Sequence, residues 1–209
     1  MELVQPIRDT AKIAAMKRHL LAGPYGTRNH LLFTLGINSG LRISDLLSLK
    51  VSDVLDTSGH VKPRIVLREK KSARKATDSS KAKAGKLKDF PLGDSSIEAI
   101  RLHLMTMPDC TTLDATQRRQ PLFASKKGGE AITRQHAWTL LNDAAKDVGI
   151  MENVGTHTLR KTFGYHAYNS GVPIETIQAM MNHGSAKETL RYIGITQDKL
   201  DKVYVTLNL

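Results

Sequence analysis

The chain has 209 residues, of which 40% are hydrophobic and 24% charged, a composition typical of a globular protein with a substantial core. The weakly polar stretch at 30–41 is too short to cross a bilayer, the N-terminus lacks an apolar signal segment, and the single cysteine excludes an internal disulfide, so we expect a cytoplasmic protein with no membrane partner. The formal net charge of +11 and the pI near 9.8 favour a polyanionic partner, for which nucleic acid is the usual one.

The first part of the chain predicts three helices. Residues 9–22 carry apolar positions at helical spacing between a capping residue and a Gly-Pro stop. Residues 28–38 predict a second, mostly buried helix that Gly40 ends. A short helix is expected over 44–49, with the serine at its start as the cap. Arg42 therefore falls in a tight turn between helices, where a long cationic side chain can reach a ligand.

A strand, a basic segment and a second strand follow. Residues 61–67 are rich in β-branched side chains and predict a strand, and residues 88–92 predict the strand that returns. Residues 68–88 hold nine Lys or Arg and two acids, so most of the positive excess of the chain lies in this segment. Its Lys, Ala, Ser and Gly content predicts an extended, flexible hairpin loop.

The second half of the chain predicts helices. One helix starts near residue 94 and runs to about 107, and a polar connection covers 108–121. The next helix spans 133–148 and is expected to hold Trp138, Leu141 and Ala145 on one face. The last three helices cover 156–170, 174–181 and a segment that Ser185 caps and that carries Tyr192. No repeat or composition shift requires a second domain, so the prediction is a single domain over 1–209, mainly α with a small antiparallel β-sheet (α+β).

Five side chains suit one kind of chemistry. In the run H-T-L-R, His157 and Arg160 lie about one turn apart on one helix face, and His183 and Tyr192 follow in N-H-G-S-A-K-E-T-L-R-Y. Arg160 and the distant Arg42 can hold the non-bridging oxygens of a phosphodiester and neutralise the charge that develops in phosphoryl transfer. The histidines can donate to the phosphate or move protons near neutral pH. A tyrosine, with an ordinary pKa of about 10, needs such a cationic site to act as a nucleophile. This set requires no metal.

These motifs resemble the catalytic domain of the tyrosine recombinase (phage integrase) family. The matching runs are S-G-L-R-I-S-D-L-L-S-L, H-T-L-R-K-T-F-G-Y-H and N-H-G-S-A-K-E-T-L-R-Y, in the order and at the separations of the family. The resemblance covers nearly all of the chain. Each run alone is a weak signal, but the ordered set is specific. It implies the tyrosine recombinase catalytic-domain fold.

The resemblance implies a function in DNA integration and recombination. Tyr192 would attack a DNA phosphate to give a 3′-phosphotyrosyl intermediate and a free 5′-hydroxyl, and a second 5′-hydroxyl would then rejoin the strand without ATP, metal or any other cofactor. Four residues would form the phosphate pocket: Arg42, His157, Arg160 and His183. Asp45 matches an acidic position that supports the first arginine. The implied partner is double-stranded DNA, bound by a homotetramer on two duplex sites that is weakly associated or monomeric without DNA.

The general acid of the family is a lysine in a short hairpin of the form K-T-G-K, and this chain departs from that pattern. E-K-K-S aligns from the first strand and gives Lys71, whereas K-A-G-K aligns from the second strand and gives Lys83, with Lys86 as a third choice. We prefer Lys71, because it follows the first strand at the expected distance.

Further expectations concern DNA contacts and the ends of the chain. Basic residues in and near the hairpin, and one at a helix start, are candidates for phosphate contacts. These are Arg68, Lys70, Arg74, Lys75 and Arg134. The N-terminal helical domain that family members use to clamp DNA is expected to be absent. The tail after Tyr192 is amphipathic enough to dock on its own domain or on a neighbour.

Two other functions fit parts of the same pattern. A non-catalytic DNA-binding regulator on this fold would not need the intact set of five residues. A type IB topoisomerase-like enzyme would share the chemistry but relax DNA without a partner duplex. Tyr165 and Tyr168 lie on the helix of Arg160, and we expect them in the core rather than as nucleophiles.

Overall fold

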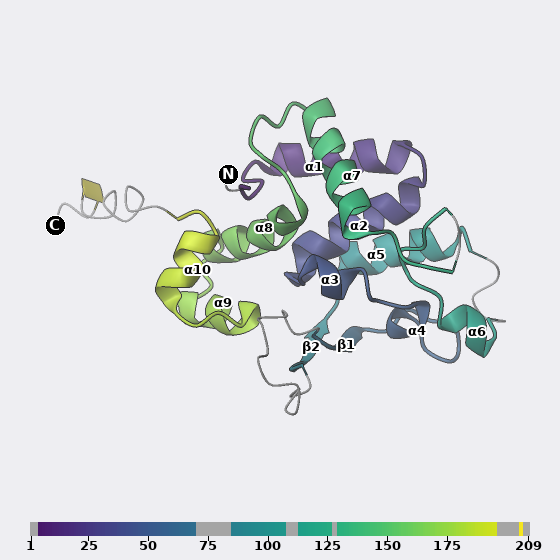
Figure 1. The fold of residues 1–209 in the computed structure, drawn as a ribbon. Helices are drawn as coiled ribbons and strands as arrows, with labels where there is room; N and C mark the ends of the chain where they lie inside the picture. The colour runs from purple at the N-terminus through teal and green to yellow at the C-terminus, as the bar shows by residue number, and fades with distance from the viewer. Residues whose placement is uncertain (1–3, 70–84, 108–112, 127–128, 196–204, 207–209) are drawn as a thin grey trace, which may run out of the picture.

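The computed structural model describes residues 4–69, 85–107, 113–126, 129–195 and 205–206. Within these ranges it shows a mainly helical fold with one two-stranded antiparallel sheet (Figure 1), which confirms the expected fold class. The elements are α1 (Thr10–Ala22), α2 (Gly26–Ser39), α3 (Ile43–Leu46), α4 (Val51–Val54), β1 (Arg64–Arg68), β2 (Leu87–Pro91), α5 (Asp94–Leu104), α6 (Ala115–Arg118), α7 (Arg134–Asp147), α8 (Thr156–Asn169), α9 (Ile174–Met181) and α10 (Ala186–Tyr192). None of the helices in the described ranges is long and apolar enough to cross a membrane.

The main hydrophobic core is built around α2. This helix is buried along most of its length, with Leu31, Leu32 and Phe33 fully enclosed, and it packs against α1, α5 and α8. The Asp9 carboxylate caps α1 by accepting a bond from the Ala11 amide, as the sequence predicts. Burial of apolar area in this core is the main force that holds the helices around α2.

A glycine turn at the end of α2 sets the position of Arg42. Gly40 has a φ of 59°, in the left-handed region, and an added Cβ would lie 2.5 Å from Phe163 Cδ1. Both facts favour glycine at this position. Arg42 follows in an extended conformation and forms the N-cap of α3, where its carbonyl accepts from the amides of Asp45 and Leu46, each at 2.9 Å. The turn therefore ends with the Arg42 side chain beside the start of the next helix.

The short helix predicted over 44–49 has different bounds. α3 begins at Ile43, and the Ser48 hydroxyl closes its end by donating to the Asp45 carbonyl at 2.8 Å. A second short helix, α4, was not predicted. The Asp53 carboxylate accepts a bond from the Lys50 amide at its start, so the motif that identifies the helix is local but only one turn long.

The predicted hairpin strands are confirmed with shifted bounds, and the second strand is Leu87–Pro91 instead of 88–92. β1 and β2 pair in antiparallel register, with Ile65 opposite Phe90. β1 begins at Arg64 rather than at Val61, because Pro63 has no amide hydrogen to donate to the ladder. Residues 70–84 lie outside the described residues. The prediction of a flexible loop falls on them and is not tested.

Two predictions in the second half of the chain are wrong in part. The polar connection over 108–121 contains α6, whose capping box pairs Asp114 with Gln117. On α7, Leu141 is buried, but Trp138 is 41% exposed. The indole lies over the backbone of Gly155, where an added Cβ would be 3.1 Å from its ring, so it covers a surface turn instead of entering the core.

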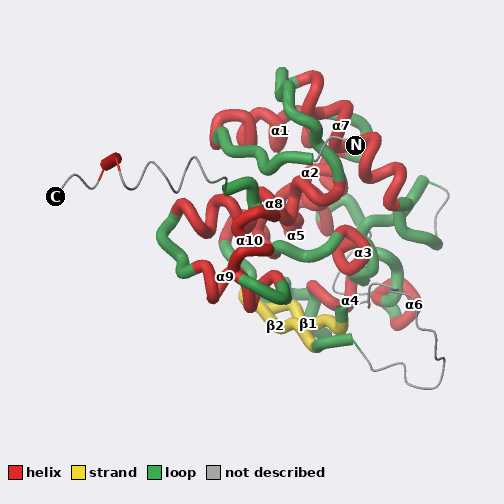
Figure 2. Tube along the Cα trace, turned by 60° about the vertical axis from the view of Figure 1, so that its left-hand side comes forward, coloured by secondary structure: helices red, strands yellow, loops and turns green. Residues whose placement is uncertain are grey.

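A second, smaller hydrophobic cluster packs against the second half of α8. Its buried residues are Ile177, Met181, Ile193 and Ile195, and α9 and α10 pack against each other around it. This unit lies at one end of α8 in Figure 1, and the hairpin lies below α8 beside α9 in both views (Figure 2). The predicted helix bounds 174–181 and the Ser185 cap of α10 are confirmed, since the Ser185 hydroxyl accepts from the Glu188 amide.

Candidate active site

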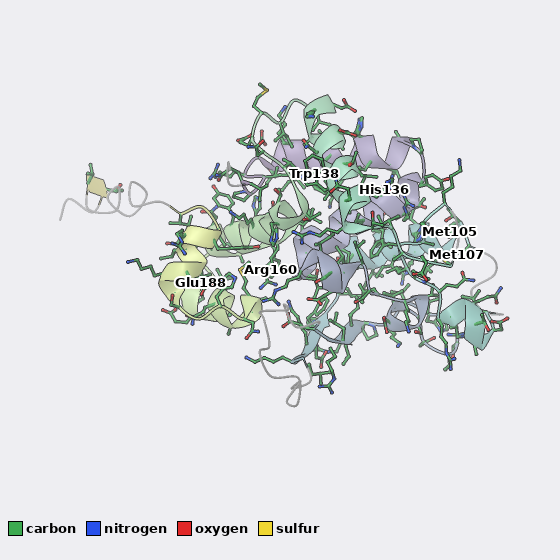
Figure 3. All side chains as sticks on the ribbon, in the orientation of Figure 1. Met105, Met107, His136, Trp138, Arg160 and Glu188 are labelled. Atoms are coloured by element: carbon green, nitrogen blue, oxygen red, sulfur yellow. The ribbon has the colours of Figure 1, made fainter. Side chains whose placement is uncertain are left out.

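Arg160 lies at the centre of the site, between the main core and the α9–α10 unit (Figure 3). Its side chain is 3% exposed, and its two terminal nitrogens donate to the carbonyls of Gly40 and Met181. Burial and the nearby Arg42 lower the pKa of Arg160, while Tyr192 and two carboxylates oppose the shift. An arginine stays protonated under these conditions, so Arg160 brings a buried, oriented positive charge to the site.

Arg42 supplies the second guanidinium. Its Nη1 donates to Glu69 Oε1 at 3.1 Å, and the Glu69 side chain is 8% exposed. Arg42 is more accessible, with 27% of its side chain exposed. Because a buried carboxylate fixes one edge of the guanidinium, the other donors of Arg42 can face a ligand.

His157 connects the nucleophile candidate to α7. Its Nδ1 lies 3.3 Å from the Tyr192 hydroxyl, and its Nε2 lies 3.3 Å from Arg134 Nη2. A guanidinium can only donate, so the neutral imidazole accepts at Nε2 and donates from Nδ1 to the phenol oxygen. Partial burial, Arg134 and then further cations lower the pKa of His157, which keeps the ring neutral at pH 7.

His183 has the same tautomer as His157, with its proton on Nδ1, but a different partner. Its Nδ1 lies 3.2 Å from Thr189 Oγ1, and that hydroxyl donates to the Ser185 carbonyl at 3.0 Å. The hydroxyl therefore accepts from Nδ1–H, which leaves Nε2 of His183 as the basic nitrogen. Burial and then Arg160 lower the pKa of His183. The site thus holds two neutral imidazoles with different hydrogen-bonding roles.

Tyr192 lies at the end of α10 among these groups. Its ring makes an edge contact with His183, with centroids 4.9 Å apart, and Lys161 Nζ lies 5.1 Å from its ring centroid. Burial raises the pKa of Tyr192, and the charges of Arg160 and Arg42 oppose this rise. A phenolate at this position would be stabilised by two guanidinium groups and by the donor nitrogen of His157.

Further charged groups complete the site. Lys88 on β2 is partly buried, and this burial, followed by the charge of Arg160, lowers its pKa to about 8. Asp45 is fully buried on α3 and acts electrostatically on both Arg160 and Lys88. Glu69 accepts a bond from Arg42, and Asp45, the acid expected to support Arg42, lies one turn after Arg42 on α3.

The structure describes some of the other predicted residues. Lys86 Nζ donates to Asn182 Oδ1 at 2.7 Å, so the hairpin reaches the end of α9, and Arg68 donates to the Gly85 carbonyl at 3.1 Å. The remaining hairpin candidates lie outside the described residues: Lys70, Lys71, Arg74, Lys75 and Lys83. In the part of the chain that the structure describes, no group of three or more His, Cys, Asp or Glu residues is arranged to hold a metal ion.

Comparison with known proteins places this geometry in a family. The model of the phage integrase family matches residues 9–199. The chain belongs to the phage integrase family. It is 36% identical to the probable integrase/recombinase YoeC of Bacillus subtilis, over 98% of this chain and 97% of that protein. It is 32% identical to the tyrosine recombinase XerD of Mycobacterium leprae, over 87% of this chain but 52% of that protein. The chain therefore spans about half the length of such XerD relatives.

Solved structures show the same integrase-family fold. The crystal structure of XerA recombinase superposes over 100% of this chain and 66% of its own, with a TM-score of 0.71 and 20% identity. The XerH site-specific recombinase, bound to its palindromic difH substrate after cleavage, matches 97% of this chain and 53% of its own, with a TM-score of 0.67 and 18% identity. The expected recognition of a tyrosine recombinase catalytic domain is confirmed.

Three residues of this integrase-family site were missed from the sequence: Glu69, Lys88 and Lys161. Glu69 and Lys88 lie in a segment rich in charge, where composition gives no reason to prefer one side chain over another. The register of the hairpin determines which basic side chain lies near Arg160, because it pairs Lys88 with Leu67. Lys161 follows Arg160 directly, and a search for charged neighbours on α8 could have found it.

Proposed function

We propose that this chain is a tyrosine recombinase that cleaves and rejoins DNA strands, with Tyr192 as the nucleophile. The observation that carries the proposal is the placement of the Tyr192 hydroxyl 3.3 Å from His157 Nδ1, beside Arg160 and Arg42. A phenol packed for structural reasons needs no pair of guanidinium groups near its oxygen. Membership of the integrase family and identity with named recombinases support the same reading.

The proposed reaction forms one phosphorus–oxygen bond and breaks another at each step. The Tyr192 oxygen attacks a DNA phosphorus, and the bond from that phosphorus to the 5′-oxygen breaks. The phenolic proton passes to a neutral imidazole, for which the basic Nε2 of His183 is the assigned acceptor. Arg42 and Arg160 neutralise the charge on the non-bridging oxygens. Attack by a 5′-hydroxyl then reverses these bond changes and releases Tyr192.

A lysine of the hairpin is proposed to protonate the departing 5′-oxygen. Lys71 remains our first choice, followed by Lys83 and Lys86. Replacing the true general acid with alanine should be rescued by a substrate whose 5′ leaving group is a thiolate, since a thiolate needs little protonation. Alanine at either other lysine should not show this rescue. Equal rescue of all three variants would contradict a single general acid.

We also propose double-stranded DNA as the partner. The net charge of +11, the basic hairpin and the position of Arg134 beside His157 support phosphate contacts on this side of the molecule. A homotetramer on two duplexes is proposed because strand exchange joins ends from two sites. The single cysteine of the chain supports a cytoplasmic location for this reaction.

Covalent trapping tests the proposal. DNA sites would first be selected from a randomised duplex pool by binding to the Tyr192→Phe protein, and then made as nicked suicide duplexes. The wild-type protein should form a covalent adduct with these duplexes in the absence of metal and ATP, and Tyr192→Phe should form none. Tyr168→Phe, a tyrosine of the smaller hydrophobic cluster, is the matched control and should still form the adduct.

The outcomes separate the rival functions. Binding without an adduct from the wild-type protein would favour a regulator that does not cleave DNA. An adduct that survives Tyr192→Phe would overturn the assignment of the nucleophile. Relaxation of a supercoiled plasmid, with no exchange between two sites, would favour a topoisomerase-like enzyme.

A further inference from the structure

We propose that Lys88 is the third cation of the phosphate pocket, a partly buried positioning residue that holds the hairpin against the Arg42 turn and takes up a proton when DNA phosphate enters the site. This inference rests on the proposed function, because it assigns a role within the same pocket. It differs from the general acid assignment, since Lys88 lies on β2 and not in the hairpin loop.

Lys88 and Arg160 bind neighbouring points at the end of α2. Lys88 Nζ lies 3.4 Å from the Ser39 carbonyl, and Arg160 donates to the carbonyl of Gly40, the next residue. The last carbonyls of a helix carry its partial negative charge and lack partners within the helix, so cations are favoured beside them. Two cations from different elements, β2 and α8, therefore fix the turn that presents Arg42.

The charges around Lys88 come from every element that packs against it. Arg160 on α8 and Arg42 before α3 are the cations, and Asp45 on α3 and Glu69 after β1 are the anions. Lys86 lies two residues earlier on the same strand. With a protonated Lys88, the group made by Lys88, the two arginines and the two carboxylates has one net positive charge. A phosphodiester would neutralise it.

The state of Lys88 without DNA makes this charge balance measurable. Burial and the two arginines hold its pKa at about 8, against an ordinary value of about 10.4. Lys88 also lines a cavity of about 560 Å³ together with Ser39 and Glu69, so protons can reach it. A phosphate anion in the pocket favours the charged form and raises the pKa of Lys88. DNA binding should therefore take up a proton at pH values above 8.

Proton uptake can be measured without cleavage. Calorimetric titration of the Tyr192→Phe protein with selected duplexes, in buffers of different ionisation enthalpy, gives the number of protons bound per complex. A tenfold preference of the phosphate for charged Lys88 predicts an uptake of about half a proton at pH 8.5. The same preference predicts that affinity falls roughly fourfold between pH 7.5 and pH 9.

Two substitutions in the Tyr192→Phe protein isolate the residue. Lys88→Arg keeps the charge at every pH, so uptake at pH 8.5 should drop by about half a proton and the fourfold fall should disappear. Lys88→Met removes the charge and should bind roughly eightfold more weakly at pH 7.5, with the same loss of uptake. Lys12→Met is the matched control: Lys12 donates to the Val148 carbonyl at 2.7 Å, and its loss should leave proton uptake unchanged.

A purely structural lysine would give a different result. If Lys88→Arg and Lys88→Met take up as many protons as their background, the proposal is wrong. If circular dichroism shows that Lys88→Met does not fold, the proton uptake of Lys88→Arg alone tests the proposal. An uptake that depends on Lys88, combined with no covalent adduct from the wild-type protein, would overturn the recombinase proposal but retain this one. Absence of any DNA binding would overturn both.

Discussion

Arg160 connects the two parts of the site through the geometry of its guanidinium. Its two terminal nitrogens donate to carbonyls from different units, Gly40 at the end of α2 and Met181 at the end of α9. A planar fork can bind both acceptors and still present charge toward Tyr192. A single ammonium cannot match this arrangement.

Arg160→Lys should therefore lower both stability and catalysis. One buried carbonyl would lose its donor, which costs about 1–3 kcal/mol in the free energy of unfolding. Loss of an oriented donor should reduce the rate constant of adduct formation by about 10²–10³. Thermal unfolding and single-turnover cleavage of a suicide duplex would measure the two effects.

The control is Arg64→Lys. Arg64 makes a half-exposed ion pair with Asp89, so this substitution should change stability and rate little. A rate for Arg160→Lys within threefold of wild type would contradict this role.

The two imidazoles predict the acid side of the pH profile. The pKa values of His157 and His183 both lie below the ordinary 6.5, so both rings are neutral at pH 7 and gain a proton only in more acidic solution. A neutral His183 is needed to accept the phenolic proton. Adduct formation should begin to fall at a lower pH than it would with histidines of ordinary pKa, and should then decrease by about tenfold for each pH unit. Single-turnover rates from pH 5 to 8 would test this.

Arg134 offers a second check on the same profile. Its charge is the largest cause, after burial, of the lowered pKa of His157. Arg134→Gln removes that charge but keeps a donor near Nε2, so the pKa of His157 should rise. If protonation of His157 also slows cleavage, the decline should then begin at a higher pH than in the wild type. An unchanged profile would assign the acid decline to His183 alone.

At the scale of elements, α8 and α10 approach each other through a glycine. An added Cβ at Gly164 would lie 2.6 Å from Ile193 Cγ2 and 3.1 Å from Met181 Sδ. Ile193 directly follows Tyr192 in the chain. The absence of a side chain at Gly164 therefore sets how close the nucleophile lies to α8.

Gly164→Ala should push the end of α10 away from α8. Overpacking of this kind costs about 1–3 kcal/mol, and the displaced Tyr192 should slow adduct formation more than it weakens DNA binding. Thermal unfolding, binding and cleavage would be measured on the same preparation. Gly93→Ala is the control, since an added Cβ there has no neighbour within 4 Å and φ is −81°. Equal rates for the two variants would contradict the close-packing argument.

The helices were predicted well because their signals are local. Asp9 and Ser185 cap α1 and α10 through bonds within one turn, and α9 has the predicted bounds. One-turn helices such as α6 give too short a pattern for periodicity to reveal. Trp138 lies on the predicted face of α7, but only the packing of α7 against the turn at Gly155 shows that this end of the face is exposed.

The site was predicted to the extent that its residues belong to sequence motifs. The five motif residues lie together in the structure, although 115 positions separate Arg42 from His157. Glu69 and Lys88 were missed because strand register, which the sequence of a charged hairpin does not define, sets their direction.

At the scale of the whole molecule, the site lies between two hydrophobic clusters of unequal size. Arg42 and Lys88 belong to the side of the larger core, and His183 and Tyr192 belong to the α9–α10 unit. His157 and Arg160 on α8 lie between them. The smaller unit has four buried hydrophobic residues among the described ones, so it has less apolar area to hold it in place than α2 has.

This division predicts unequal local stability. Amide hydrogens of α9 and α10 should exchange faster than those of α2, because opening the small cluster exposes less apolar surface than opening the main core. Binding of a nicked duplex to the Tyr192→Phe protein should slow exchange in α9 and α10 more than in α2, since a phosphate held by Arg42 and His183 would join the two units. Hydrogen-exchange mass spectrometry with and without DNA measures both effects.

Arg160→Lys should speed exchange in α9 in the free protein, because the bond from Arg160 to the Met181 carbonyl is one of the links between the two units. Equal protection of α2 and α9 in the free protein would show instead that the two clusters open as one cooperative unit.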